Sequence, residues 1–324
     1  MLLAGDVGGT KTLLGVFERG DRRPAMIAAH SYVTSAYGSF GEILDAFARD
    51  VGDRGRIDAA AVGVAGPVVA NCARLTNIVW DISAEDISRR LGGPRVQLIN
   101  DLEAMASSVD ALTPDEIVVL QEGVPRADGN AAVIAAGTGL GEAYLHRVGG
   151  RLRPIPSEGG HADFAARTDR EIEFVRMLRE RYGRAEVEHV LSGPGLLNLH
   201  RFTHRGGQCE ILEGAEEPDT PAVVSQAALT GRCQGCADAL RMFVGAYGAE
   251  AGNLALRGVT TSGLYVGGGI APKILPALRS GTFMDAFLAK APMSELLSKV
   301  PVKVILCDDA GLIGAAVHAQ ELVG

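Results

Sequence analysis

The sequence predicts an α/β protein with two lobes. Apolar, strand-like runs alternate with segments of helical periodicity, which is typical of sheets covered by helices. The 324 residues exceed the roughly 250–300 residues at which a single core stops growing. A unit of strand, Gly/Thr turn and strand occurs twice, about 130 residues apart, which favours two related α/β halves.

In the first half, the apolar runs and their flanking turns predict a strand, a glycine loop, a strand, a helix, a strand, a helix, a strand and a helix. A capping box at Ser83 to Asp86 marks the start of the second helix. Gly66-Pro67 ends the buried strand before it. The expected ranges are 1–4, 5–11, 12–17, 40–51, 59–64, 83–91, 96–100 and 102–111.

In the second half, strand, glycine turn and strand recur and are followed by a long, mostly helical stretch. Pro272 fits the first turn of a helix that follows the last glycine run. The expected strands are 117–120, 131–136, 142–146, 264–266 and 302–306, and the helical segments are 169–256 and 310–322.

Composition restricts the partners and the compartment. A net charge of −8 and an aromatic content of 5% disfavour nucleic acid as a partner. The start of the chain lacks a basic region and no apolar run reaches the ~20 residues that span a bilayer, so neither a signal peptide nor a membrane segment is expected. Five sparse cysteines do not suggest a disulfide framework, and we expect a cytoplasmic protein.

The first glycine loop, Gly5-Asp6-Val7-Gly8-Gly9-Thr10-Lys11, has features of a phosphate-binding loop but is not a Walker A motif. Thr10 stands where that motif needs glycine, and a strand follows where a helix should. Its glycines let backbone amides approach phosphate oxygens, and Thr10 and Lys11 add donors. Asp6 suits Mg²⁺ bound through water. The alternative is a tight hairpin turn without a ligand.

Two further glycine runs follow, Gly137-Thr138-Gly139-Leu140-Gly141 and Gly267-Gly268-Gly269. The spacing of the first excludes the dinucleotide fingerprint. The turns at Gly5 and Gly137 can hold a polyphosphate from both sides of a cleft. The third run suits a nucleoside or an α-phosphate, because it joins a strand to a helix N-terminus.

Asn100-Asp101 lies between a buried strand and a helix, where ligands gather in α/β sheets. A carboxylate there can accept a hydroxyl proton and orient the oxygen for attack on a γ-phosphate. The alternative is that Asp101 only caps the helix.

Glu158 and His161 lie three residues apart in a glycine-rich segment and offer hydrogen-bonding groups to sugar hydroxyls. Glu188, before Leu191-Ser192-Gly193-Pro194-Gly195, is by itself an ordinary acid. The pair Cys233 and Cys236 has no second Cys or His pair at finger spacing, and we interpret it as structural.

Together these motifs resemble bacterial glucokinases of the hexokinase and actin-like ATPase superfamily. The resemblance covers nearly the whole chain in the family's order. It implies a two-lobed actin-like ATPase (ribonuclease H-like) fold with a cleft between the lobes. We expect a small domain of residues 1–111 plus 310–324 and a large domain of residues 112–309. The quoted motifs are Gly5 to Thr10, Asn100 to Ala104, Gly137 to Gly141, Ser157 to His161, Leu191 to Gly195 and Gly267 to Ile270.

The resemblance implies phosphorylation of the glucose 6-hydroxyl by ATP with Mg²⁺, the first step of glycolysis, in a homodimer. By position Asp101 matches the catalytic base, and Asn100, Glu158, His161 and Glu188 match glucose-binding residues. The positions expected to bind ATP are Gly5, Asp6, Val7, Gly8, Gly9, Thr10, Gly137, Thr138, Gly139, Gly268 and Gly269, with Asp6 also expected to hold Mg²⁺ through water.

Two departures separate the chain from its relatives. Lys11 stands where many members carry Asn, and the zinc-binding cysteine cluster of the related repressor and sugar-kinase family is absent. The alternatives are a kinase for mannose, fructose or an N-acetylhexosamine, and a sugar-sensing regulator without catalysis. Asp101 and the acidic net charge disfavour the regulator.

Overall fold

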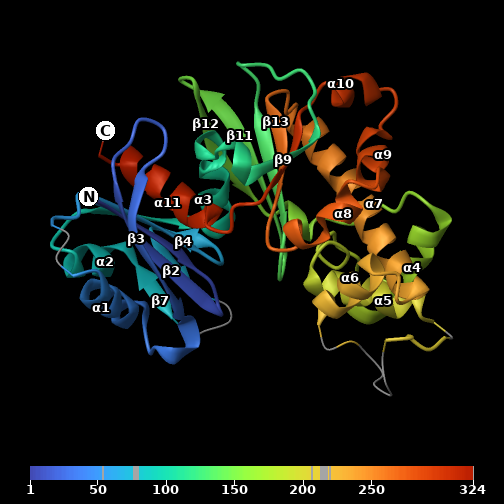
Figure 1. Ribbon diagram of the computed structural model, residues 1–324, viewed down its shortest axis with the longest axis horizontal. Coiled ribbons are helices and arrows are strands. Elements are labelled where there is room, and N and C mark those ends of the chain that lie inside the picture. The colour runs from blue at the N-terminus through green and yellow to red at the C-terminus, as the bar shows by residue number, and fades with distance from the viewer. Residues whose placement is uncertain (53–54, 76–79, 206, 212–217, 219, 324) are drawn as a thin grey trace. The chain divides into compact units, whose positions relative to one another are not determined.

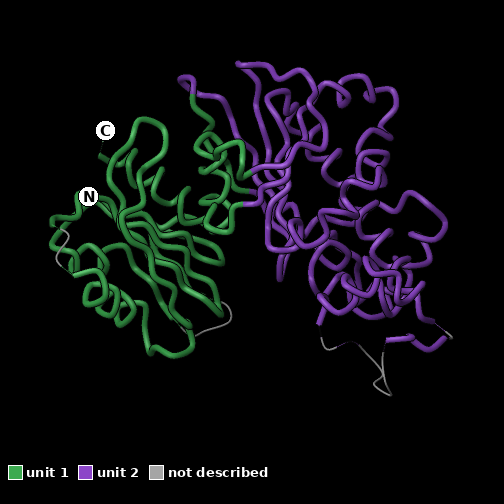
Figure 2. The backbone as a smooth tube through the Cα atoms, viewed as in Figure 1, with its two compact units in different colours: residues 1–116, 151–156, 307–324 green, residues 117–150, 157–306 purple. Residues whose placement is uncertain are grey.

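The computed structural model describes the whole chain except residues 53–54, 76–79, 206, 212–217, 219 and 324. The chain forms two compact units (Figure 2). Unit 1 contains residues 1–116, 151–156 and 307–324, and unit 2 contains residues 117–150 and 157–306. Among the described residues no helix is both long and apolar enough to cross a membrane.

Unit 1 is built on a five-stranded mixed sheet (Figure 1). The central strand β1 pairs antiparallel with β2 and parallel with β4, which in turn pairs parallel with β8. In sheet order the strands are β3 (Ala25–Val33), β2 (Lys11–Glu18), β1 (Leu2–Val7), β4 (Ala59–Val64) and β8 (Arg95–Asn100). A separate small sheet contains β5 (Val68–Val69), β6 (Cys72–Arg74) and β7 (Asp81–Ser83).

Helices cover both faces of this sheet because its central strands are apolar on both sides. Leu3 and Val7 of β1 pack in one cluster with α1 (Phe40–Val51) and α2 (Ala84–Arg90). Leu2 and Ala4 point the other way and pack with α3 (Asp101–Ser107) and α11 (Ala310–Glu321). The predicted helix 40–51 and strand 59–64 are confirmed at both ends, and Ser83 caps α2 by accepting from Asp86 N.

Unit 2 has its own sheet and a larger set of helices. The strands that lie wholly within unit 2 run in the order β11 (Leu140–Val148), β10 (Ala131–Ala136), β13 (Gly263–Gly267), β14 (Val302–Ile305) and β9 (Ile117–Gln121). The helices are α4 (Asp169–Tyr182), α5 (Gly193–Thr203), α6 (Pro221–Leu229), α7 (Gln234–Gly258), α8 (Leu275–Leu278), α9 (Thr282–Leu288) and α10 (Ser294–Ser298). The long helix α7 packs along the core of this unit with Phe243, Tyr247 and Leu254 buried.

The strand pairing confirms the predicted relationship between the two halves. β10 pairs antiparallel with β11 and parallel with β13, just as β1 pairs with β2 and β4. Each unit therefore has a glycine turn at the end of its central hairpin and a parallel strand beside it. The same backbone plan occurs twice without close sequence similarity.

Several sequence-based boundaries were wrong. The first strand continues to Val7, so Gly5, Asp6 and Val7 are paired in β1 and only residues 8–10 form the loop. The helix expected at 102–111 begins at Asp101, ends at Ser107 and gives way to a 3₁₀ turn at Val109–Ala111. The strands β3 and β12 (Arg151–Ser157) were not predicted.

The observed units also differ from the expected domain bounds. Residues 112–116, 151–156 and 307–309 cluster with unit 1. The backbone N–H of Leu152 donates to Asp110, and Arg153 forms an ion pair with Glu321 of α11. These contacts attach a segment from the middle of the chain to a unit made mainly of its two ends.

The hydroxyl of Tyr247 on α7 forms hydrogen bonds with the backbone of the unit 2 sheet. Its fully buried hydroxyl accepts from Ala136 N at 3.2 Å and lies 3.3 Å from the carbonyl oxygens of Ile134 and Gly267. Tyr247→Phe leaves a buried amide without its acceptor, so we expect a loss of roughly 1–3 kcal/mol in unfolding free energy by urea denaturation. Tyr182→Phe, at a partly exposed ring, is the control and should cost less. Equal losses in both variants would contradict this role.

Candidate functional site

In unit 1 the candidate residues meet at one edge of the sheet because three parallel strands end in register. Val7 of β1 lies opposite Val64 of β4, which lies opposite Asn100 of β8. The carboxyl ends of these strands are followed by the turn 8–10, by Gly66 and by Asp101. This edge is the usual ligand-binding edge of an α/β sheet.

The turn at residues 8–10 is held by β2 and by Thr34, the first residue after β3. Gly8 N donates to Lys11 O at 3.0 Å, and Thr34 N donates to Thr10 O at 3.0 Å. The Thr34 hydroxyl donates to Gly8 O at 2.9 Å and lies 3.0 Å from the hydroxyl of Thr12. The exposed side chains of Thr10 and Lys11 stand at a turn of fixed shape.

Asp6 lies on β1, partly buried, at a concentration of negative charge. Its pKa is raised to about 6, mainly by burial and then by the nearby Asp101 and Asp309 carboxylates, against the opposing effect of Lys11. A Cβ on Gly311, at the start of α11, would lie 2.8 Å from Asp6 Oδ2, so glycine permits this close approach. Crowded oxygen donors of this kind fit a hard cation such as Mg²⁺.

The N-cap of α3 is Asn100, so the alternative interpretation that Asp101 only caps this helix is wrong. Asn100 Oδ1 accepts from Leu102 N at 2.9 Å, and its Nδ2 donates to Gly66 O at 3.2 Å. Asp101 is the first helical residue, is exposed, and also accepts from Leu102 N at 2.8 Å. An amide nitrogen carries two hydrogens, so Asn100 retains a donor beyond its capping role.

In unit 2 two of the glycine runs lie at the same sheet edge. Ala135 of β10 lies opposite Gly267 of β13 in a parallel pair, so the turn at 137–139 and Gly268 follow adjacent strand ends. Gly193 N, at the start of α5, donates to Gly137 O at 2.8 Å. Gly268 has φ +81°, and a Cβ there would collide with the backbone of Ala136. Glycine is required at this position by both conformation and space.

Glu188 is bound directly to the turn between β10 and β11. Its Oε2 accepts from Leu140 N at 2.8 Å, and a Cβ on Gly139 would lie 2.5 Å from the same oxygen. Its backbone N–H donates to Gly160 O at 2.9 Å, and its carbonyl accepts from the Ser192 hydroxyl at 2.7 Å. The structure therefore places this predicted residue beside both the Gly137 turn and the Glu158 to His161 segment.

His161 is held by an acid that sequence reasoning missed. Its Nδ1 lies 3.3 Å from Glu186 Oε1, and Glu186 also contacts His189 and Arg184. A proton on Nδ1 shared with Glu186 leaves Nε2 as an acceptor. The spacing of Glu186 and Glu188, on either side of a buried Val187, was the available signal in the sequence.

Three of these side chains also bring ligand atoms together that an ion can bind. The ligand atoms of His161, Glu186 and Glu188 lie within 4.8 Å of one another. Glu158 is exposed and precedes the 3₁₀ turn Gly159–His161, in which His161 N donates to Glu158 O at 3.0 Å. The same carboxylate and imidazole groups are the acceptors that a polyhydroxylated ligand needs.

The two glycines of this turn leave room for the strand beneath it. A Cβ on Gly159 would collide with the carboxylate of Glu142, and one on Gly160 with the carbonyl of Leu140. Glu142 on β11 is buried, and its Oε1 has no hydrogen-bond partner among the described residues. The turn that carries Glu158 and His161 thus packs directly against the buried side chain of Glu142.

The predicted site residues fall into two groups. Asp6, the turn at 8–10, Asn100 and Asp101 lie in unit 1, whereas the Gly137 and Gly268 turns, Glu158, His161 and Glu188 lie in unit 2. Gly5 and Val7 lie inside β1 with strands on both sides. Within each unit, register and hydrogen bonds bring together residues that are far apart in the sequence.

Known proteins resemble this chain over its full length. A family model described as Glucokinase matches residues 3–322. A glucokinase from Nostoc sp. is 36% identical over 340 residues, covering 99% of both chains. The crystal structure of a glucokinase from an Antarctic psychrotroph matches with a TM-score of 0.88 and 30% identity, covering 99% of this chain and 98% of that one.

A more distant structure shares the fold. A ROK family glucokinase from Streptomyces griseus, in complex with glucose and AMPPNP, matches with a TM-score of 0.66 and 21% identity, covering 99% of both chains. The predicted α/β fold of the actin-like ATPase type is confirmed by these structures.

Glu142 should make the stability of the protein depend on pH. Burial, and secondly the Glu250 carboxylate, raise the pKa of Glu142 from 4.5 to about 7, against the opposing effect of Arg257. The folded state therefore holds this proton more tightly than the unfolded state, and stability falls as pH rises from about 4.5 to about 7. The loss is at most roughly 3 kcal/mol.

Glu142→Gln removes this titration, so urea unfolding should show a smaller decrease in stability between pH 5 and pH 8 than the wild type shows. Glu180→Gln, at an exposed position on α4, is the control and should behave as the wild type. Parallel pH profiles for wild type and Glu142→Gln would show that Glu142 is not the titrating group.

Proposed function

The chain belongs to the glucokinase family, which phosphorylates glucose with ATP, and we propose that Asp101 is the base of this reaction. Asp101 accepts the proton of the glucose 6-hydroxyl as that oxygen attacks the γ-phosphate. The observation that carries the proposal is the parallel register of β1, β4 and β8, which brings Asp101 to the same edge as Asp6 and the turn at 8–10.

The local structure suits Asp101 to this role. Asn100 caps α3, so the carboxylate of Asp101 is not required for capping. Its hydrogen bond from Leu102 N fixes the direction of the side chain, while the residue stays exposed to an incoming hydroxyl. A fixed, accessible acceptor positions a substrate hydroxyl for in-line attack without further rearrangement.

We assign glucose binding to Asn100, Glu158, His161 and Glu188. Carboxylates accept hydrogen bonds from sugar hydroxyls, and the amide of Asn100 supplies a donor. Glu188 uses one acceptor site on Leu140 N, and a carboxylate offers about four such sites. Glu186 acts as a positioning residue, because it holds the ring of His161.

We assign the nucleotide to the glycine turns. The candidates are Gly8, Gly9 and Thr10 in unit 1, and Gly137, Thr138, Gly139, Gly268 and Gly269 in unit 2. The N–H groups of Gly8 and Gly137 donate to Lys11 O and Gly139 O, so these two glycines shape turns whose other N–H groups can face phosphate oxygens. Gly5 and Val7 support the first turn from within β1. Asp6 would hold Mg²⁺ through water, and the ion, when bound, neutralises phosphate charge.

We also make three proposals about the pathway, the cellular location and the oligomeric state of the protein. Phosphorylation at the 6-hydroxyl places the reaction at the start of glycolysis. The absence of a disulfide framework among the sparse cysteines supports a cytoplasmic location. We also propose a homodimer, as the family resemblance implies.

Replacing the proposed base tests the mechanism. Asp101→Asn keeps the size of the side chain but cannot accept the proton, so kcat should fall by roughly 10²–10⁴. Glucose affinity, measured by calorimetry, should change much less. Asp86→Asn, which alters an exposed first-turn acid of α2, is the control and should keep kcat. Near-normal turnover by Asp101→Asn would refute the assignment.

Replacing Glu188 tests the sugar site. Glu188→Gln keeps an acceptor for Leu140 N but loses the charge that strengthens hydrogen bonds from sugar hydroxyls. The KM for glucose should rise by roughly tenfold or more, with little change in the KM for ATP. Glu180→Gln on α4 serves again as the control. An unchanged KM for glucose would exclude Glu188 from the sugar site.

A further inference from the structure

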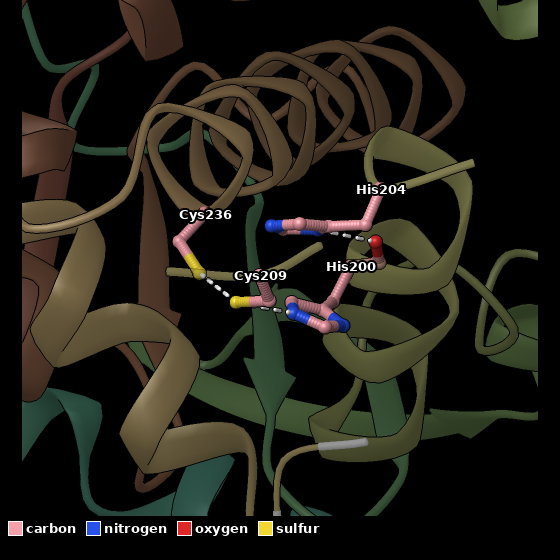
Figure 3. A group of neighbouring side chains, drawn as sticks. All are labelled: His200, His204, Cys209 and Cys236. Atoms are coloured by element: carbon pink, nitrogen blue, oxygen red, sulfur yellow. Dashed lines mark hydrogen bonds between the residues drawn. The ribbon is translucent and has the colours of Figure 1, made fainter. Parts of the chain in front are cut away.

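Five metal-ligating side chains gather in the core of unit 2, apart from every residue assigned above. This His/Cys cluster contains His200 and His204 at the end of α5, Cys209 in the following turn, and Cys233 and Cys236 at the start of α7. Figure 3 shows four of them, with the side chains converging from the two helices and the turn. The ligand atoms of His200, His204, Cys209 and Cys236 all lie within 4.8 Å of one another.

The sulfur–sulfur and nitrogen–sulfur separations at Cys209 fit a tetrahedral metal site. Cys209 Sγ lies 3.8 Å from Cys236 Sγ and 3.8 Å from Cys233 Sγ. Zn–S bonds of ~2.3 Å at tetrahedral angles place two sulfurs ~3.8 Å apart, whereas a disulfide holds them at ~2.05 Å. His200 Nε2 lies 3.3 Å from Cys209 Sγ, slightly inside the ~3.6 Å expected for a Zn-bound nitrogen and sulfur.

Hydrogen bonding orients the imidazole of His204 so that one ring nitrogen can bind a metal ion. Its Nδ1 lies 2.8 Å from the carbonyl oxygen of His200, so Nδ1 carries the proton and donates it there. Nε2 is left with its lone pair and faces the sulfurs, 3.2 Å from Cys233 Sγ. Metal-bound histidines usually have this arrangement, in which the second nitrogen is held by a backbone carbonyl.

The sequence around the cluster favours this geometry. His200 and His204 are four residues apart, so they lie on the same side of α5 and its end. Cys233 caps α7 and Cys236 lies in its first turn. A Cβ on the intervening Gly235 would lie 2.5 Å from His204 Nε2, so glycine is what allows this ring to approach α7.

The two helix ends are also joined beside the cluster, and four of its five members are buried, whereas His204 is partly exposed. The Thr203 hydroxyl donates to Gly235 O at 2.8 Å. Cys209, Cys233, Cys236 and His200 are all buried. These thiols and imidazoles can supply four protein ligands, three of them buried, and four protein ligands are the pattern of a structural zinc site rather than a catalytic one.

We propose that His200, His204, Cys209 and Cys236 bind one Zn²⁺ ion, with Cys233 beside them as a hydrogen-bonding thiol. The ion joins the end of α5 to the start of α7. The other end of α5 carries Ser192 and Gly193, which hold Glu188 and the Gly137 turn, and α7 carries Tyr247. Zinc would therefore stabilise the two helices that support the unit 2 part of the candidate site.

This proposal corrects the interpretation of Cys233 and Cys236 as a pair without further ligands. His200-x₃-His204 is a His pair at finger spacing, and it lies before the cysteines rather than after them. Cys209 belongs to neither pair and enters the cluster only because the turn after α5 folds back. The proposal does not depend on the reaction assigned to Asp101.

Metal analysis of the full-length, tag-free protein tests the site. Protein expressed with added zinc and purified under reducing conditions should contain about one zinc per chain. After replacement by Co²⁺, the wild type should show sulfur-to-cobalt charge transfer and the strong visible bands of tetrahedral cobalt. Removal of the metal by a chelator should lower Tm by roughly 5–10 °C, reversed by adding zinc.

Variants separate this site from adventitious binding. Cys209→Ser and Cys236→Ser should each lower the zinc content below about one tenth of the wild-type value, whereas the controls Cys72→Ser and Cys307→Ser, in unit 1, should retain it. The cobalt spectrum of the wild type needs no variant and keeps the proposal testable if a variant fails to fold. Wild-type protein without zinc and without tetrahedral cobalt bands would overturn it.

A count of reactive thiols distinguishes free cysteines, which can bind zinc, from a disulfide within the cluster. Zinc-free protein that is denatured without a reducing agent should expose all five cysteine thiols. A count of three would reveal a disulfide within the cluster and would overturn the zinc site.

Discussion

Parallel pairing of neighbouring strands is the constraint on which the rest of the structure depends. Parallel strands end at the same sheet edge, so residues 36 or more positions apart in sequence come together without any loop having to reach across. In unit 1 this brings together Val7, Val64 and Asn100. In unit 2 it brings together Ala135 and Gly267. The chemical groups then need only follow the strand ends directly.

The sites also require glycine at several positions. At these positions the missing side chain matters because it leaves room for a neighbouring group, and not because the backbone has an unusual conformation. Gly311 allows α11 to approach Asp6, Gly139 allows Glu188 to approach its turn, and Gly235 allows His204 to approach α7. In each case a methyl group would meet a polar atom that the site uses. The high glycine content of the chain is therefore explained in part by close contacts between the backbone and functional side chains.

The sequence was informative where local patterns decide the structure. The apolar period predicted α1 and β4 at their observed ends, and the motif order predicted the family. It could not show that Gly5 lies inside β1, because a strand interior and a loop accept the same residue. Glu186 and Cys209 were missed because their roles arise only from tertiary contacts.

The packing of α11 has a consequence for how the protein is made. Leu312 and Ala315 of this helix fill the same cluster as Leu2 and Ala4, and Gly314 packs against the backbone of Ala104. A ribosome therefore completes the whole of unit 2 before it releases the helix that closes the core of unit 1. The nascent chain cannot assemble the surroundings of Asp6 during elongation, so phosphoryl transfer begins only after translation has passed this helix.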